Sequence, residues 1–252
     1  MDIDKELLPP AFRVVNEMGT SPYVLVCEHA SRFIPPNYQG LGLSETDLLR
    51  HIAWDIGAEN VALRVSHQLD ASLILANYSR LLIDLNRPLG SETSIPELSE
   101  RTTIPGNMKL GDVEKRNRVE RYFNPFQFRL SQLLDARKEK GVLTIIIGIH
   151  SFTPVFKDVV RPWHAGVLYR RSEIFGKALV EALGGAKSNV VGNQPYQIDD
   201  KSDYTVPVHG EARGLDSVLV EIRHDMIAEI DGAANWSSRI GAALHDCMGR
   251  RG

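Results

Sequence analysis

Two histidines follow short apolar segments of the kind that form buried strands. His29 comes soon after residues 23–27 (YVLVC), and His150 follows residues 142–147 (VLTIII). Runs of apolar and β-branched residues without alternation predict strands that are buried on both faces of a helix-covered sheet. Open α/β sheets place their ligands at the carboxyl ends of such strands. A lone histidine there is more often structural, but the layout occurs twice, and we interpret both histidines as metal ligands.

Asp55 is a candidate for a third ligand, through a carboxylate oxygen. It lies four residues after His51 in a region expected to be helical, residues 45–68, so a surface ion pair between the two is the plain alternative. Its neighbours are mostly apolar, however, and Gly57 interrupts the helical pattern. This favours a carboxylate at the start of a new helix close to the sheet edge.

A dense polar cluster accompanies the expected strand at residues 81–85 (LLIDL). The cluster consists of Arg80, Asp84, Asn86 and Arg87. An arginine presents a rigid fork that suits a carboxylate, and an asparagine amide can donate to a carbonyl oxygen. The cluster therefore suits an acidic substrate, although we also expect Asp84 to form a buried structural pair with one of the arginines.

Glu221 lies inside an apolar segment, residues 217–222 (SVLVEI), and Arg223 follows it. A carboxylate in a buried strand is costly unless it is paired with a cation or takes part in chemistry. Glu221 is therefore either the partner of an arginine such as Arg223 or a general base, and the residues alone leave both open.

The elements that would position these residues alternate along the chain, which predicts an α/β fold. Pro125 should kink or split a long helix expected at residues 112–140. Two polar stretches, residues 90–112 and 193–207, are expected as long loops at the rim of a site. Further strands are expected at residues 71–76, 166–170 and 188–191, and further helices at 112–140, 172–183 and 227–248.

Composition bounds the class of protein. With 252 residues, 43% of them hydrophobic, the chain can bury one large core, and we expect a single domain over residues 1–252. A net charge of −3 argues against nucleic-acid and anionic membrane partners, and two cysteines are too few for a disulfide framework. Residues 1–10 have no apolar h-region, so we expect a cytoplasmic protein. Association into a homo-oligomer stays open.

Five segments together resemble the N-formylglutamate amidohydrolase family, over about residues 24–225. That family is similar in fold to the zinc carboxypeptidases and to the aspartoacylase and succinylglutamate desuccinylase group. The resemblance implies a mixed, mostly parallel sheet flanked by helices, of the phosphorylase/hydrolase-like kind. The segments are residues 27–31 (CEHAS), 51–58 (HIAWDIGA), 79–87 (SRLLIDLNR), 149–152 (IHSF) and 220–223 (VEIR).

The resemblance also implies a ligand set. In the wider group the first metal-binding histidine is followed three residues later by a glutamate, but here Arg32 stands at that distance from His29. Asp55 is the first replacement and Glu28 the second, because a catalytic zinc site commonly has three protein ligands and one open position. His150 matches the second histidine of the group.

The remaining roles follow from the same resemblance. Asn86 and Arg87 match an Asn-Arg pair that holds the substrate carboxylate and the oxyanion, and Glu221 matches the general base. Ser151 and Arg223 are expected to complete the substrate contacts.

The expected chemistry is metal-dependent amide hydrolysis. A divalent metal, with zinc as the first candidate, would polarise the carbonyl and lower the pKa of its water to about 7. Glu221 would move the proton, and Arg80 or Arg87 would stabilise the oxyanion or bind the substrate carboxylate. The first candidate reaction converts N-formyl-L-glutamate, an N-acyl amino acid, to formate and L-glutamate.

Two other functions stay open. One is a deacylase or carboxypeptidase-like hydrolase of another acyl amino acid or small peptide, and the other is a non-catalytic homologue that binds a carboxylate. A serine hydrolase is disfavoured because no GxSxG motif occurs, and a dinucleotide enzyme because no GxGxxG follows a strand.

Overall fold

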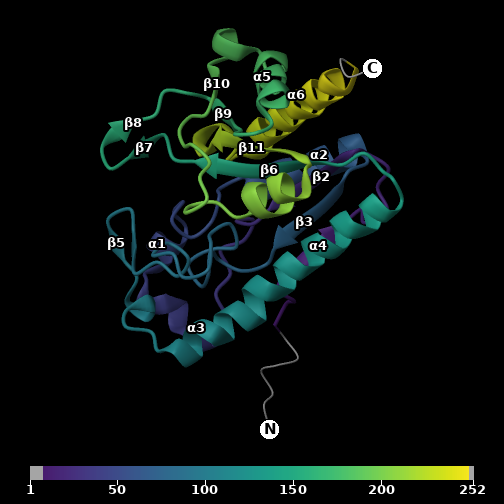
Figure 1. Ribbon diagram of the computed structural model, residues 1–252. Coiled ribbons are helices and arrows are strands. Elements are labelled where there is room, and N and C mark those ends of the chain that lie inside the picture. The colour runs from purple at the N-terminus through teal and green to yellow at the C-terminus, as the bar shows by residue number, and fades with distance from the viewer. Residues whose placement is uncertain (1–7, 250–252) are drawn as a thin grey trace.

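The computed structural model describes residues 8–249. Residues 1–7, which belong to the N-terminal segment considered above for a signal sequence, lie outside the described residues. Within residues 8–249, one seven-stranded sheet has the order β1-β3-β2-β6-β11-β9-β10 (Figure 1). Its strands are β1 (Phe12–Val15), β2 (Tyr23–Cys27), β3 (Ser72–Ala76), β6 (Ile145–Phe152), β9 (Ala165–Leu168), β10 (Val190–Gly192) and β11 (Asp216–Arg223).

The sheet is mixed and mostly parallel, as predicted. β3, β2, β6 and β11 run parallel to their neighbours in this central part, and β10 is parallel to β9. β1 pairs antiparallel with β3, and β9 pairs antiparallel with β11. Two small hairpins lie outside this sheet, β4 (Leu98–Ser99) with β5 (Thr102–Thr103) and β7 (Val155–Phe156) with β8 (Val159–Val160).

Helices cover both faces of the sheet (Figure 1). The helices α2 (Ala58–Leu69), α5 (Glu173–Ala182) and α6 (Ile230–Gly249) pack on one face, and α4 (Asn124–Glu139) packs on the other. All five residues of β2 are buried, which confirms the prediction of strands enclosed on both faces. Among the helices within residues 8–249, none is long and apolar enough to cross a membrane.

The helical region expected at residues 45–68 is broken. α1 (Glu45–Leu48) ends after one turn, and α2 begins only after Gly57. Gly57 has a positive φ of 80°, and a Cβ there would lie 2.2 Å from the carbonyl oxygen of Ile227. A side chain does not fit in this place. The new helix after Gly57 is therefore confirmed, and Asp55 lies in the turn before it.

The strand predicted at residues 81–85 is wrong. This segment forms turns, although its apolar residues are buried beside α4. Side chains replace the hydrogen bonds of a sheet: the carbonyl of Leu82 accepts from Arg118, and that of Leu85 accepts from Gln127. Since the backbone acceptors are satisfied in this way, a buried apolar segment does not need to be a strand.

The long helix expected at residues 112–140 is present with one irregularity. α3 (Asp112–Arg118) continues through a π-helical turn, Val119–Phe123, into α4. Pro125 stands in the first turn of α4, where the missing N–H of proline is tolerated. The expected kink or split therefore takes the form of a π-helical turn.

Short helical turns complete the chain, and most of them lie in the long connections. Residues 193–207, expected as a rim loop, end in one of them. The 3-10 turns are Pro36–Gly42, Pro105–Asn107, Gly185–Ser188, Glu211–Arg213 and His224–Met226, and a second π turn is Thr205–Gly210.

Candidate active site

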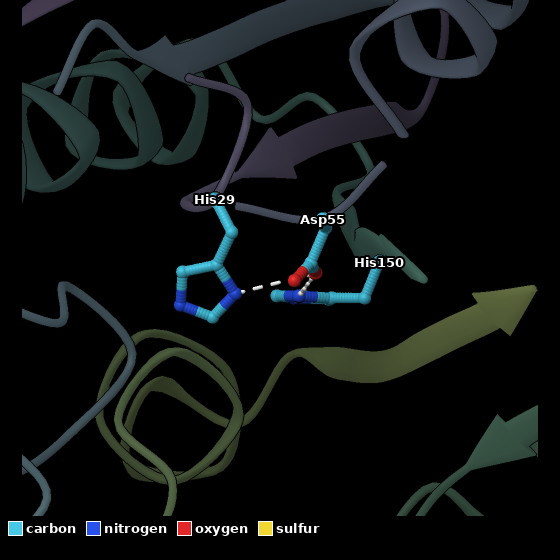
Figure 2. A group of neighbouring side chains, drawn as sticks. All are labelled: His29, Asp55 and His150. Carbon is cyan, nitrogen blue, oxygen red and sulfur yellow. Dashed lines mark hydrogen bonds and ion pairs between the residues drawn. The ribbon is translucent and has the colours of Figure 1, made fainter. Parts of the chain in front are cut away.

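The three predicted metal ligands lie together at the carboxyl ends of the central strands of the sheet. His29 follows β2, Asp55 precedes α2, and His150 lies near the end of β6. One nitrogen or oxygen of each residue lies within 4.8 Å of those of the other two, and all three side chains are buried. Figure 2 shows the Asp55 carboxylate between the two imidazoles. Its Oδ2 lies 3.3 Å from His29 Nδ1 and 2.9 Å from His150 Nδ1.

His150 lies inside β6, whereas the sequence predicts it beyond the end of the strand. β6 continues to Phe152 because β11 continues equally far beside it, with Arg223 paired to Phe152. The parallel ladder therefore carries His150 within a strand, and the chain leaves the sheet only before Pro154.

Each histidine faces a second carboxylate through its other nitrogen. His29 Nε2 lies 2.7 Å from Asp84 Oδ1. His150 Nε2 lies 3.2 Å from Glu28 Oε2, without the alignment of a hydrogen bond. A neutral imidazole has only one N–H, so each neutral ring turns a lone pair toward a carboxylate oxygen on one side. A second proton on the ring, or a metal ion in the place of a proton, would relieve that repulsion.

Neighbouring charges in the site shift the pKa values of His150 and Asp55. Burial disfavours the charged form of His150, but the Glu28 and Asp55 carboxylates outweigh it and raise the pKa of His150 well above its usual value. Burial likewise opposes ionisation of Asp55, yet His29, His150 and Arg80 hold the pKa of its carboxyl far below the usual value. The acids here are therefore ionised and able to bind a cation.

Of the two carboxylates proposed as third ligand, Asp55 groups with both histidines. Glu28 is fully buried on the other side of His150, where its Oε1 accepts a hydrogen bond from the hydroxyl of Thr205. Glu28 therefore lies behind His150, where a carboxylate commonly orients a metal-bound histidine.

Glu221 faces the same site from β11. It is 7% exposed, and within the described residues its Oε2 has no hydrogen-bond partner. Burial raises the pKa of Glu221 to about 7. The salt-bridge alternative receives no support, because Arg223 pairs with Asp225 at 2.8 Å and also donates to the carbonyl of Pro162.

Arg80 is fixed by two acids. Its Nε and Nη2 donate to Asp84 Oδ2 at 2.9 and 2.7 Å, and its Nη1 donates to Asp55 Oδ1 at 3.2 Å. The expected buried pair between Asp84 and an arginine is thus present. The same guanidinium borders the cavity beside the histidines.

Asn86 and Arg87 contact a distant segment that the sequence did not connect to them. The Oδ1 atom of Asn86 accepts from the backbone N–H groups of Tyr204 and Thr205, at 3.1 and 2.9 Å. Arg87 donates to the carbonyl of Ser202. Both residues also line the cavity, so they hold its rim in place.

Ser151 mainly supports Asp55. Its backbone N–H donates to Asp55 Oδ2 at 3.2 Å, and its hydroxyl donates to the carbonyl of Ile56 at 2.9 Å. It also borders the cavity, whereas Arg223 is not among the residues that line it.

A cavity of about 210 Å³ joins these residues. Sequence reasoning expected a rim loop at residues 193–207 but did not identify which of its side chains reach the site. Apart from the predicted residues, the lining consists of Leu168, Tyr196, Gln197, Ser202, Asp203 and Leu219.

Comparison with known proteins identifies the family. The N-formylglutamate amidohydrolase model matches residues 21–228, and no curated protein matches the chain. A gene product of Agrobacterium tumefaciens has a similar crystal structure, with a TM-score of 0.93, 34% identity and 96% of both chains covered.

An N-formylglutamate amidohydrolase of Ralstonia eutropha shares the fold, with a TM-score of 0.69 at 17% identity, covering 96% of this chain and 99% of that one. The family match extends over most of the present chain and includes every ligand candidate described above. The chain therefore belongs to the N-formylglutamate amidohydrolase family.

Proposed function

We propose that this amidohydrolase cleaves the amide bond of an N-acyl amino acid and that it requires a divalent metal. The first candidate substrate is N-formyl-L-glutamate, which would give formate and L-glutamate. One observation carries the proposal: two histidines and an aspartate converge within 4.8 Å beside a buried glutamate that has no partner for its Oε2 among the described residues.

The donor atoms suit a divalent cation. Imidazole nitrogen and carboxylate oxygen are the ligands that zinc takes in catalytic sites with three protein ligands. His29, His150 and Asp55 would hold the metal, and Asp84 and Glu28 would orient the two rings from behind. When bound, the metal would supply Lewis acidity toward the amide carbonyl and toward a water.

Glu221 is the proposed general base. Its carboxylate lines the cavity beside the histidines, and no arginine neutralises it within the described part of the chain. Glu221 would accept a proton from the attacking water and return it to the leaving amine. Its neighbours Val220 and Ile222 are buried in the core, so the strand holds the carboxylate in one place.

Two arginines supply positive charge for the substrate. Arg80 is held rigidly by Asp84 and is placed to stabilise the developing oxyanion. Arg87 also borders the cavity, and Asp203 lies 4.0 Å from its Nη1, so the guanidinium is only loosely paired. We assign a substrate carboxylate to Arg87.

Other acyl amino acids and small peptides are the competing substrates, and a carboxylate-binding protein without activity is the competing function. The cavity of about 210 Å³ favours a small acyl amino acid over an extended peptide. A binding protein alone would have no use for an unpaired carboxylate in the core, since burying one is costly.

The test uses protein purified without chelator. Metal content is measured by mass spectrometry, and glutamate release is followed for N-formyl-L-glutamate, N-acetyl-L-glutamate and a dipeptide. About one metal ion per chain, loss of activity with a chelator and preference for the formyl substrate would support the proposal. Stoichiometric metal without hydrolysis of any substrate would contradict the activity, and full activity in metal-free protein would contradict the metal requirement.

A further inference from the structure

Arg161 is a buried arginine just after β8. It is only 8% exposed, and its guanidinium packs against aromatic rings. The guanidinium carbon lies 4.6 Å from the ring centre of Phe156, 4.8 Å from that of Tyr196 and 6.0 Å from that of Phe152. These rings stabilise the cation but do not neutralise it.

Arg161 has no acidic partner within the described residues. The one hydrogen bond that its guanidinium makes there runs from Nη1 to the hydroxyl oxygen of Tyr196, at 2.9 Å. Arg137 is a useful comparison, since it is also buried and also lacks an acid, yet it donates to four oxygens. Arg161 is therefore a buried cation whose charge no acid of the described residues neutralises.

Tyr196 connects this cation to the active site. Its side chain lines the same cavity as Glu221. Glu221 is paired with Gly166 across β11 and β9, and a Cβ on Gly166 would lie 1.6 Å from the carbonyl oxygen of Gln194. The backbone at Gln194, two residues before Tyr196, therefore packs against Gly166, the residue of β9 that is paired with Glu221.

The direction of the hydrogen bond leaves Tyr196 with a free donor. A guanidinium can only donate, so the Tyr196 oxygen accepts from Arg161 and its own O–H stays available. No described residue accepts that proton. A hydroxyl that accepts from a cation and belongs to a residue lining the cavity is suited to donate to an anionic oxygen there.

We propose that Arg161 and Tyr196 form a second carboxylate subsite of the cavity, which binds the side-chain carboxylate of an N-acyl dicarboxylic amino acid. This assignment rests on the proposed function, in which Arg87 takes the other carboxylate. Tyr196 would contact the ligand directly, while Arg161 orients the hydroxyl and supplies the positive charge. The subsite would make the enzyme prefer N-acylglutamate to its neutral amide.

The experiment compares kcat/KM for N-formyl-L-glutamate and for N-formyl-L-glutamine, which differ in the side-chain charge. The variants are Tyr196→Phe, which removes one oxygen atom, Arg161→Gln, and Arg161→Lys, which keeps the charge. Arg239→Gln is the matched control, because Arg239 also stacks on an aromatic ring, that of Trp236 at 4.2 Å, but lies outside the cavity.

We expect Tyr196→Phe and Arg161→Gln to lower kcat/KM for the glutamate substrate by about 10–100-fold, the usual effect of losing a charge-assisted hydrogen bond. The glutamine substrate should change little, Arg161→Lys should recover part of the loss, and Arg239→Gln should leave the ratio of the two substrates unchanged. Equal losses on both substrates would overturn the proposal, because they would mean that the pair only supports the fold.

A binding measurement separates this proposal from the proposed function. If the wild-type protein hydrolyses neither substrate, the activity is wrong, and calorimetry with glutarate and its monoamide tests the subsite directly. Tighter binding of glutarate to wild type than to Tyr196→Phe, at equal unfolding temperatures, supports the subsite. Equal binding to both proteins, or no binding of glutarate to wild type, overturns it.

Discussion

Glu221 and His150 occupy paired positions on the adjacent parallel strands β11 and β6. Paired residues of neighbouring strands project from the same face of the sheet, so the candidate base and a candidate metal ligand emerge side by side. Gly148 keeps this face open, because a Cβ there would lie 2.4 Å from Leu219 and 3.3 Å from the His150 ring. The strand register therefore places the candidate base beside one of the candidate metal ligands.

The first prediction concerns the base. Glu221→Gln keeps the shape of the side chain but removes the proton acceptor, so kcat should fall by about 10²–10⁴. Metal content should stay near that of the wild type, since Glu221 is not among the three grouped ligands. Turnover kinetics and mass spectrometry check both parts. An unchanged kcat would show that the base lies elsewhere.

The second prediction concerns the ligands. His150→Ala and His29→Ala should each strip the metal, because either change removes one of three donor groups. Activity should be lost while the far-UV circular dichroism spectrum stays native-like. His67→Ala on the exposed surface of α2 is the control and should keep both metal and activity. Retention of metal by both site variants would contradict the ligand set.

The third prediction concerns Asn86. Asn86→Ala removes the oxygen that accepts from the backbone N–H groups of Tyr204 and Thr205. Leaving these groups without a partner should cost about 1–3 kcal/mol in the free energy of unfolding. Hydrogen exchange of the two amides should become faster, and Asn86→Asp, which keeps an acceptor oxygen, should protect them better. Unchanged exchange in the alanine variant would contradict this role.

The fourth prediction concerns stability against pH. Burial and the nearby Arg213 cation lower the pKa of His209 to about 4 in the folded protein, compared with about 6.5 in the unfolded chain. The unfolded state therefore binds the proton more readily, so this contribution is complete above pH 6.5 and decreases as the pH falls toward 4. Between pH 7 and 5 the loss should be about 2 kcal/mol.

Urea unfolding of the wild type and of His209→Gln at both pH values provides the measurement. Other groups titrate equally in the two proteins, so the difference between their pH dependences isolates His209. The glutamine variant should lose about 2 kcal/mol less than the wild type over this range. Identical losses would show that His209 is protonated in the folded state.

Sequence predicts that the three candidate metal ligands lie together, and the structure groups them, because the signals that mark them are local. His29 and His150 are marked by the apolar segments that precede them, and Asp55 by the interruption at Gly57. Once the strands are parallel neighbours, their carboxyl ends must meet at one edge. The mixed sheet and the two helical layers follow from the same strands and from the periodic helices between them.

The parts that sequence does not predict depend on contacts between distant segments. Residues 81–85 have the composition of a strand, and only the side chains of Arg118 and Gln127 show why their carbonyls need no sheet. Arg161 and Tyr196 lie in two different loops, and they come into contact because Gly166 has no side chain. No local sequence pattern predicts such a contact.

The bonds of Asn86 and Arg87 to residues 202–205 have a consequence for how ligands bind. A loop that orders only when a substrate arrives loses conformational entropy at that moment, and affinity falls accordingly. Here the rim is already ordered by the fold, so that entropy is lost once, when the chain folds. A ligand would therefore enter a preorganised cavity, and its affinity would reflect the contacts it makes there.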